Sequence, residues 1–288
     1  MKELSTIDRR QFLRNSLLGS AAVSSVGLPA HLFAAASNSQ REPDHGLKLG
    51  ITTYTLRKFS LEQAIAMTQE AELKYISLKD MHLPLKSTRA ERQEAHKKLE
   101  AAGLVLMGGG VISIKNNEQQ IREIFDYVHD AGMPTIVCSP EPAALDTVEK
   151  MAKEYNLRIA IHNHGPGDKL YPSPLDVLRN VEDRDARMGI CMDLGHTVRI
   201  GEDPVAAIEK CGSRLHDFHM KDVTAANEKG APIEVGKGVI DIPDVLKALI
   251  RMKYLNHVAL EYEANADYPM PGVKASILYI RRVLGDIG

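Results

Sequence analysis

The sequence of 288 residues has no tryptophan, few cysteines and a formal net charge of only −2. Without tryptophan, any stacking of an aromatic side chain on a ligand is left to tyrosine or phenylalanine. Cys138, Cys191 and Cys211 are odd in number and lack metal-type spacing, so we interpret them as small buried apolar residues rather than a disulfide framework. The balanced charge and the absence of a lysine-arginine run leave no basic face, so nucleic acid is not an expected partner.

The N-terminal segment has the composition of an export signal. Arg9 and Arg10 precede an apolar stretch, Ser16–Val26, and a small-residue cluster, Ala34-Ala35-Ala36. This order predicts a twin-arginine signal peptide over residues 1–36 and a linker over 37–46, rather than a short amphipathic helix. The expected partner is the twin-arginine export machinery, and the expected location is periplasmic or otherwise exported. The apolar stretch is too short for a membrane span of about 20 residues, so no stable membrane association is expected.

From Leu47 onward, short apolar runs alternate with segments of helical spacing. The expected strands are Leu47–Thr53, Tyr75–Leu78, Leu104–Gly108, Thr135–Cys138, Arg158–Ile161, Met188–Met192, Leu215–Phe218 and His257–Leu260. The expected helices are Ser60–Ala71, Arg89–Ala102, Glu118–Ala131, Ala143–Tyr155, Ser173–Asn180, Pro204–Cys211, Ile242–Met252 and Val273–Leu284. Strict alternation implies parallel strands with helical crossovers, and eight units predict a single α/β domain, a (β/α)8 TIM barrel over residues 47–288.

A doubly wound open sheet is the competing fold. It usually has a glycine-rich phosphate-binding turn between an early strand and the helix that follows. The only glycine cluster, Gly108-Gly109-Gly110, follows the third expected strand, and the next residues, Val111 to Ile114, do not open a helix. The pattern therefore favours the closed barrel.

Each of the last four expected strands ends at a candidate metal ligand: His162, Asp193, His219 and Glu261. Aligned on their apolar starts, the strands place these side chains at one height at the carboxyl end of the barrel, where such enzymes have their active sites. Two imidazoles and two carboxylates suit one divalent ion, Mn²⁺, Co²⁺, Zn²⁺ or Mg²⁺. One such residue alone is more often a hydrogen-bonded structural residue or a helix cap, but four in succession indicate a metal site.

The motifs around these residues resemble those of the xylose-isomerase-like barrel superfamily, and the resemblance covers essentially the whole chain after Leu47. They are Asp193-x-x-His196, His219-Met220-Lys221-Asp222, Val258-Ala259-Leu260-Glu261-Tyr262-Glu263 and the loop Glu234–Asp241. The superfamily includes sugar isomerases, ketose 3-epimerases, inosose dehydratases and endonuclease-IV-type repair enzymes. The resemblance implies a metal held by Glu, Asp, His and Glu from strands five to eight. This sequence departs from it with His162 in place of the first glutamate, so either His162 or His164 is the expected ligand.

A metal-bound hydroxy-ketone loses a neighbouring proton through a metal-stabilised enediolate. Glu261 is the candidate carboxylate for this proton transfer, with His164 and His196 as candidate partners because imidazoles titrate near neutral pH. Lys221 is a candidate to neutralise a developing oxyanion; the alternative is a structural ion pair with Asp222 or Asp193.

Further residues are candidates for contacts with the substrate. Lys79 and His82 follow the second expected strand and can reach the site from the opposite wall, unless they belong to a solvated loop. The remaining candidates follow three other strands: Tyr54, Glu141 and Glu263.

These expectations define a function. The chain is expected to be a metal-dependent isomerase or epimerase of an unphosphorylated sugar or keto-sugar, because sugar phosphates are scarce outside the cytoplasm and no glycine-rich phosphate cradle is evident. The alternatives are a dehydratase or lyase of keto-sugars or 3-keto-glycosides on the same site, and a periplasmic sugar-binding barrel without catalysis. An endonuclease is disfavoured because it needs more metal ligands and a basic groove. Homo-oligomers through the outer helices are compatible with the sequence.

Overall fold

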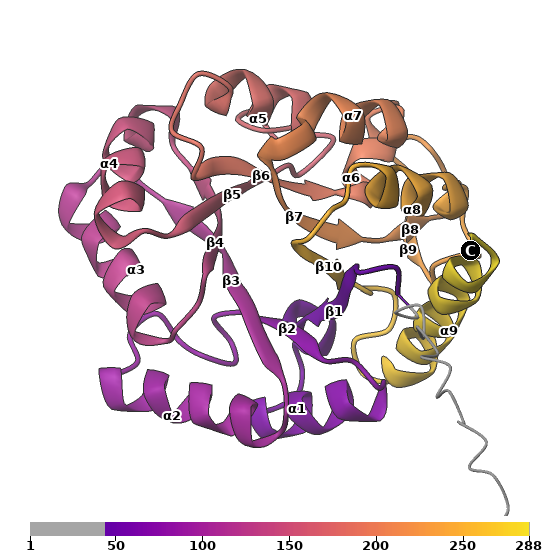
Figure 1. The fold of residues 1–288 in the computed structure, drawn as a ribbon, viewed down its shortest axis with the longest axis horizontal. Helices are drawn as coiled ribbons and strands as arrows, with labels where there is room; N and C mark the ends of the chain where they lie inside the picture. The colour runs from indigo at the N-terminus through magenta and orange to yellow at the C-terminus, as the bar shows by residue number, and fades with distance from the viewer. Residues whose placement is uncertain (1–43, 288) are drawn as a thin grey trace, which may run out of the picture. The chain divides into compact units, whose positions relative to one another are not determined.

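The computed structural model describes residues 44–287, and within them eight parallel strands close into a barrel (Figure 1). The order around the barrel is β1-β10-β7-β6-β5-β4-β3-β2. Their bounds are β1 Lys48–Thr52, β2 Tyr75–Leu78, β3 Val105–Ile114, β4 Thr135–Pro140, β5 Arg158–His162, β6 Met188–Asp193, β7 Leu215–Met220 and β10 His257–Leu260. The predicted (β/α)8 barrel is confirmed. The predicted signal peptide and most of the predicted linker lie outside the described residues.

Helices surround the strands (Figure 1). The main ones are α1 Leu61–Glu70, α2 Arg89–Ala101, α3 Glu118–Asp130, α4 Leu145–Tyr155, α5 Pro174–Val181, α7 Pro204–Cys211, α8 Ile242–Arg251 and α9 Met270–Ile287. Several begin at capping residues: the Ser60 side chain accepts from the Gln63 backbone N–H while the Gln63 side chain accepts from the Ser60 backbone, the capping box that the sequence predicts. None of the helices in residues 44–287 is both long and apolar enough to cross a membrane.

The barrel strands are buried on both faces, since helices cover the outside and side chains fill the inside. Every residue of β6 and β7 is buried. Inside the barrel, Val137, Ala160 and Cys191 form a small apolar cluster with Val111 packed against it. By the two-residue period of a strand, Ala160 and Cys191 share the inward face with His162 and Asp193. The inner apolar layer thus supports the polar residues at the carboxyl ends of the strands.

Three local features differ from the expectations. β3 runs through the glycine cluster to Ile114; at Gly110, where φ is +131°, a Cβ atom would lie 1.9 Å from the Val137 carbonyl oxygen, so only glycine fits. A short helix, α6 (Leu194–Arg199), directly follows β6. After β7, the strands β8 (Asp222–Val223) and β9 (Pro232–Ile233) pair as a small antiparallel sheet.

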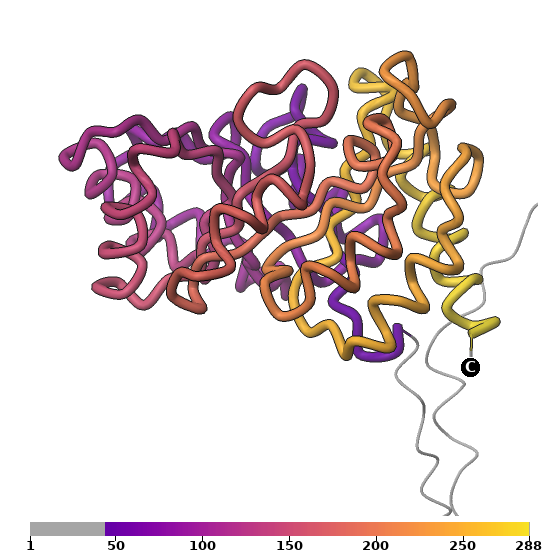
Figure 2. Tube along the Cα trace, turned by 90° about the horizontal axis from the view of Figure 1, so that it is seen from above, coloured from indigo at the N-terminus to yellow at the C-terminus, as the bar shows by residue number. Residues whose placement is uncertain are grey.

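The loops that follow the strands gather at one end of the barrel. Figure 2 shows the loop after β5 and the segment after β7 projecting at the same end, opposite the turn that leads into β10. This end is the one that carries the strand-end side chains of the candidate site.

Candidate metal centre

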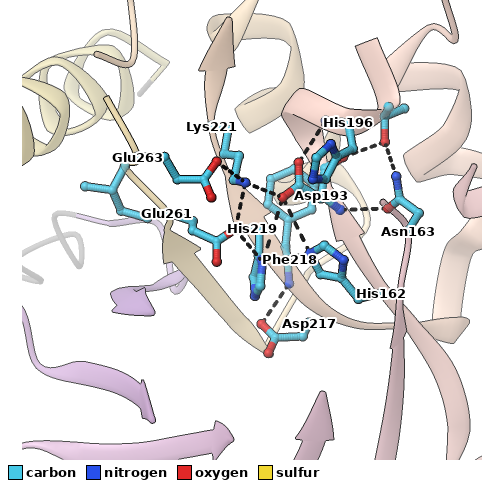
Figure 3. Close-up of polar contacts among 12 residues, drawn as sticks. His162, Asn163, Asp193, His196, Asp217, Phe218, His219, Lys221, Glu261 and Glu263 are labelled. Atoms are coloured by element: carbon cyan, nitrogen blue, oxygen red, sulfur yellow. Dashed lines mark hydrogen bonds and ion pairs between the residues drawn. The ribbon is translucent and has the colours of Figure 1, made fainter. Parts of the chain in front are cut away.

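Four side chains from consecutive barrel strands meet at this end (Figure 3). His162 ends β5, Asp193 ends β6, His219 lies in β7, and Glu261 directly follows β10. Asp193 and His219 are paired in the register of β6 and β7, which puts them at one height. The exposed fraction of each of the four residues is 6% or less, and one ligand atom from each lies within 4.8 Å of the other three. We call these four residues the metal cluster.

The distances within the metal cluster fit a single small ion. Nε2 of His162 lies 3.1 Å from Nδ1 of His219 and 3.5 Å from Oδ2 of Asp193. Nδ1 of His219 lies 3.2 Å from Oε2 of Glu261 and 3.9 Å from Oδ2 of Asp193. Ligand atoms at about 2.1 Å from a tetrahedrally coordinated ion are about 3.4 Å apart, so these separations suit such an ion. Nitrogen and carboxylate donors are the set expected for a divalent transition metal.

The two oxygens of Asp193 have different roles. Oδ1 accepts a hydrogen bond of 2.8 Å from the backbone N–H of His196 and caps the N-terminus of α6, whereas Oδ2 faces the metal cluster. The carboxylate is therefore held in one orientation by the backbone of the Asp193-x-x-His196 motif. The helix cap considered from the sequence is therefore present, and the second oxygen of the same carboxylate remains directed at the metal cluster.

Asn163 is a residue that the sequence reasoning missed. It is fully buried; its Oδ1 accepts from the Asp193 backbone N–H at 2.8 Å, and its Nδ2 donates to Oγ1 of Thr197 at 3.3 Å. Asn163 thus links the end of β5 to the start of α6. Its position between two histidines, His162 and His164, is the signal in the sequence that points to it.

Lys221 is buried beside the metal cluster, with an exposed fraction of 5%. Its Nζ lies 2.9 Å from Oδ2 of Asp193, 2.8 Å from Oε2 of Glu261 and 3.0 Å from Oε2 of Glu263. Burial opposes the charged form, but the carboxylates outweigh it and raise the pKa of Lys221 well above its ordinary value. The ion pair with Asp193 considered from the sequence is present, and two glutamates share it.

Asp222 pairs with the backbone rather than with Lys221. Its Oδ2 accepts from the backbone N–H groups of Gly236 and Gly238, each at 2.9 Å, and its Oδ1 accepts from Val223 at 2.9 Å and Ile240 at 3.3 Å. Asp222 therefore fixes the loop Glu234–Asp241 against the end of β7.

The two imidazoles of the metal cluster have opposite protonation tendencies. Burial lowers the pKa of His162 to about 3, so its imidazole is neutral, the form that can coordinate a metal. Burial also opposes the charge on His219, but Glu261 and the nearby aspartates outweigh it and raise its pKa above the ordinary value. A divalent ion would take the place of that proton among the carboxylates.

His164 and His196 lie next to the metal cluster, outside it. The ring of His164 lies 4.5 Å from that of His162, tilted by 57°, and its Nδ1 lies 3.3 Å from Oδ2 of Asp168. The ring of His196 lies 5.9 Å from that of His162 and 6.2 Å from that of His164. The geometry thus places His162 at the cluster and leaves His164 partly exposed beside it, where burial lowers its pKa.

Lys79 and Tyr54 form a second group at the ends of β2 and β1. Nζ of Lys79 lies 5.2 Å from the ring centroid of Tyr54, and the guanidinium of Arg57 lies 4.8 Å from it. The backbone N–H of Lys79 donates to Oγ1 of Thr53 at 2.8 Å. Burial lowers the pKa of Lys79, while the charge of Glu261 acts in the opposite direction.

Two of the predicted substrate-contact residues have other surroundings. His82 is buried and lines a groove of about 910 Å³ beside α1 and α2. Oε1 of Glu141 pairs with Nζ of Lys115 at 3.0 Å, and its Oε2 accepts from the backbone N–H of Asn116 at 2.9 Å. The structure does not bring either residue into the metal cluster, whereas Glu263 reaches it through Lys221.

Comparison with known proteins places the chain in a family. Residues 65–283 match the family model "Xylose isomerase-like TIM barrel". Inosose dehydratase of Clostridium botulinum (strain Eklund 17B / Type B) is 27% identical over 142 residues, 44% of this chain and 47% of that protein, so the chain spans about half the length of the curated relatives it matches.

Solved structures share the fold at low identity. The 3-keto-D-glucoside 4-epimerase of E. coli is 15% identical with a TM-score of 0.67, over 82% of this chain and 99% of that chain. A D-psicose 3-epimerase is 14% identical with a TM-score of 0.67, over 83% of this chain and 100% of that chain. At these identities the likeness shows the fold alone. With the family match over most of the barrel, it follows that this chain belongs to the xylose isomerase-like TIM barrel family.

Proposed function

We propose that this protein is a divalent-metal-dependent isomerase or epimerase of an unphosphorylated sugar or keto-sugar, acting by abstraction of a proton next to a carbonyl group. The observation that carries the proposal is the convergence of His162, Asp193, His219 and Glu261 at the mouth of the barrel. The ion, when bound, polarises the substrate carbonyl and stabilises the negative charge that develops as the neighbouring proton leaves. Relatives of the fold that are named epimerases support this class of reaction.

His164 is the residue best suited to transfer the proton. Its side chain is 35% exposed and lies beside the His162 ring, and because burial lowers its pKa the imidazole is neutral, hence a base, at neutral pH. Glu261 is less suited, because Lys221 and His219 outweigh its burial and lower its pKa, which makes it a weak base. Glu261 is better placed as a ligand, and His196 as the neighbour of His164.

Lys79 and Tyr54 are the proposed substrate contacts on the opposite wall. No acidic group lies within ion-pair distance of the Lys79 ammonium among the described residues, so the ammonium is available for a substrate oxygen. The Tyr54 ring provides the aromatic face that the absence of tryptophan leaves to tyrosine.

The test is exchange with solvent. Purified protein loaded with Mn²⁺, Co²⁺, Zn²⁺ or Mg²⁺ is incubated with unphosphorylated ketoses in D₂O, and deuterium at the carbon next to the carbonyl is followed by NMR. We expect metal-dependent exchange that His164→Ala reduces at least about a hundredfold. Exchange only with phosphorylated sugars would contradict the proposed substrate class.

A dehydratase or lyase is the second candidate, because the curated relatives are named inosose dehydratase. Such an enzyme begins with the same proton abstraction and then loses a hydroxyl or glycosyl group from the next carbon. The exchange experiment separates the two: a dehydratase or lyase gives a new product of lower mass, and an epimerase gives an isomer. Metal binding without exchange or product would indicate a sugar-binding barrel.

Export through the twin-arginine machinery is part of the proposal, because it separates the enzyme from cytoplasmic sugar phosphates. Replacing the pair Arg9-Arg10 by two lysines is expected to leave the full-length precursor in the cytoplasm. Cell fractionation and the N-terminal sequence of the exported protein test this.

A further inference from the structure

Lys221 contacts the same carboxylate oxygens that a metal would need. Oδ2 of Asp193 faces His162 at 3.5 Å and also lies 2.9 Å from the Lys221 ammonium. Oε2 of Glu261 faces His219 at 3.2 Å and also lies 2.8 Å from that ammonium. Two of the four ligand atoms are thus already paired with a cation from the chain itself (Figure 3).

The third contact of Lys221 lies outside the metal cluster. Nζ is 3.0 Å from Oε2 of Glu263, which is 25% exposed and is not one of the four converging residues. The aliphatic part of Lys221 packs closely against Gly195: a Cβ atom on Gly195 would lie 3.2 Å from Cβ and 3.3 Å from Cδ of Lys221. Of the three carboxylates that contact the ammonium, Glu263 is the one that would remain available to it if an ion occupied the other two.

We propose that the Lys221 ammonium and the divalent ion compete for the same two carboxylates, Asp193 and Glu261. Lys221 neutralises the two carboxylates when the metal is absent, and Glu263 retains the ammonium when the metal binds. The inference rests on the proposed function, since it assumes that the metal cluster binds an ion. An ion about 2.1 Å from Oε2 of Glu261 can be no more than about 5 Å from Nζ as the lysine now lies. Two cations so close in a buried site repel each other strongly, because water screens them little.

The charges predict opposite effects on stability and on metal affinity. Without metal, the three carboxylates and Lys221 carry a net charge of −2, and removal of the ammonium leaves three uncompensated carboxylates. Lys221→Met should therefore lower the melting temperature of the metal-free protein and yet bind Mn²⁺ about ten- to a hundredfold more tightly, because no ammonium has to be displaced. The melting-temperature gain on adding Mn²⁺ should be larger in the variant than in the wild type.

Glu263 provides a second, independent variant. Glu263→Gln removes the group that holds the displaced ammonium, so Mn²⁺ should bind several-fold more weakly than to the wild type. In the Lys221→Met background the same substitution should have almost no effect, because no ammonium remains to be held. Lys79→Met is the matched control. It removes a lysine at the same end of the barrel, but this lysine has no ion pair with Asp193 or Glu261, so the substitution should change the Mn²⁺ affinity much less.

The experiment is calorimetric titration of Mn²⁺ into the metal-free wild type, Lys221→Met, Glu263→Gln, the double variant and Lys79→Met, with melting curves for each. Tighter binding by Lys221→Met together with the loss of the Glu263 effect in the double variant supports the proposal. Equal affinities for the wild type and Lys221→Met, or an undiminished Glu263 effect in the double variant, overturn the proposal and leave the metal site intact.

Absence of Mn²⁺ binding in every variant would overturn both this inference and the proposed function. If Lys221→Met does not fold, Lys221→Gln takes its place, and a Glu263→Gln affinity equal to that of the wild type overturns the proposal by itself.

Discussion

Nε2 of His162 lies 3.1 Å from Nδ1 of His219, although 57 residues separate them in the sequence and β6 lies between their strands. Two side chains can meet across an intervening strand only if both point into the barrel at the same height. The contact therefore fixes His162 as the β5 member of the metal cluster. His164, two residues further, lies in the loop beyond the strand.

This relationship predicts different outcomes for the two histidines. His162→Ala should weaken metal binding at least about a hundredfold, because it removes one of four ligands. His164→Ala should keep the affinity within about threefold of the wild type and lose turnover instead. Metal titration and D₂O exchange on the same preparations measure both effects. Retention of the metal by His162→Ala together with its loss from His164→Ala would assign the ligand to His164.

His216 predicts a pH dependence of stability. It is 5% exposed, its Nδ1 lies 2.8 Å from the Ile159 carbonyl oxygen, and burial lowers its pKa from 6.5 to about 4. Between these pH values His216 binds a proton in the unfolded chain but not in the folded protein. The stability that neutral His216 provides above pH 6.5 is therefore lost as the pH falls toward 4. A pKa lowered from 6.5 to about 4 corresponds to about 3 kcal/mol of unfolding free energy once the pH is well below both values.

The matched measurement is urea unfolding of the wild type and His216→Gln at pH 7.5 and pH 4.5. Burial raises the pKa of Asp217 to about 6, which has the opposite effect in part of this range, so only the difference between the two proteins isolates His216. We expect the wild type to lose more free energy than His216→Gln on acidification. Parallel losses would show that His216 takes up its proton in the folded state as well.

The hydrogen bonds of Asp222 predict that removing its side chain destabilises the protein without removing a member of the metal cluster. Asp222→Ala leaves the backbone N–H groups of Gly236, Gly238 and Ile240 without their acceptor and should destabilise the protein by about 3 kcal/mol. Hydrogen exchange should increase first in the loop Glu234–Asp241. Unchanged exchange there would mean that other contacts hold the loop.

Much of the fold follows from local pattern. The bounds of β2 and β10 agree with those predicted, Tyr75–Leu78 and His257–Leu260, because turn residues and polar residues flank compact apolar runs. The same pattern brings the four members of the metal cluster together, since each follows a mostly apolar strand segment, half apolar before His219, and shares the inward face of its strand.

Other features of the candidate site could not be predicted, because the hydrophobic pattern does not give the directions of the side chains outside the strands. His82 lies in the loop beyond β2, where the alternation of a strand no longer sets its direction, and it faces α1 and α2. Lys221 has a long, flexible side chain, and only the placement of Asp193, Glu261 and Glu263 around it selects its partners. The short helix α6 depends on the cap that Asp193 provides, a role that the sequence alone could not separate from metal binding.

The most direct test of the account is the metal content of the purified exported protein, measured by elemental analysis for the wild type, Asp193→Ala and His219→Ala. We predict about one Mn, Co, Zn or Mg per chain in the wild type and its loss from both variants, with a melting temperature that rises on adding that ion to the wild type alone. No bound metal in the wild type and no stabilisation by any divalent ion would contradict a metal-dependent enzyme and favour a sugar-binding barrel.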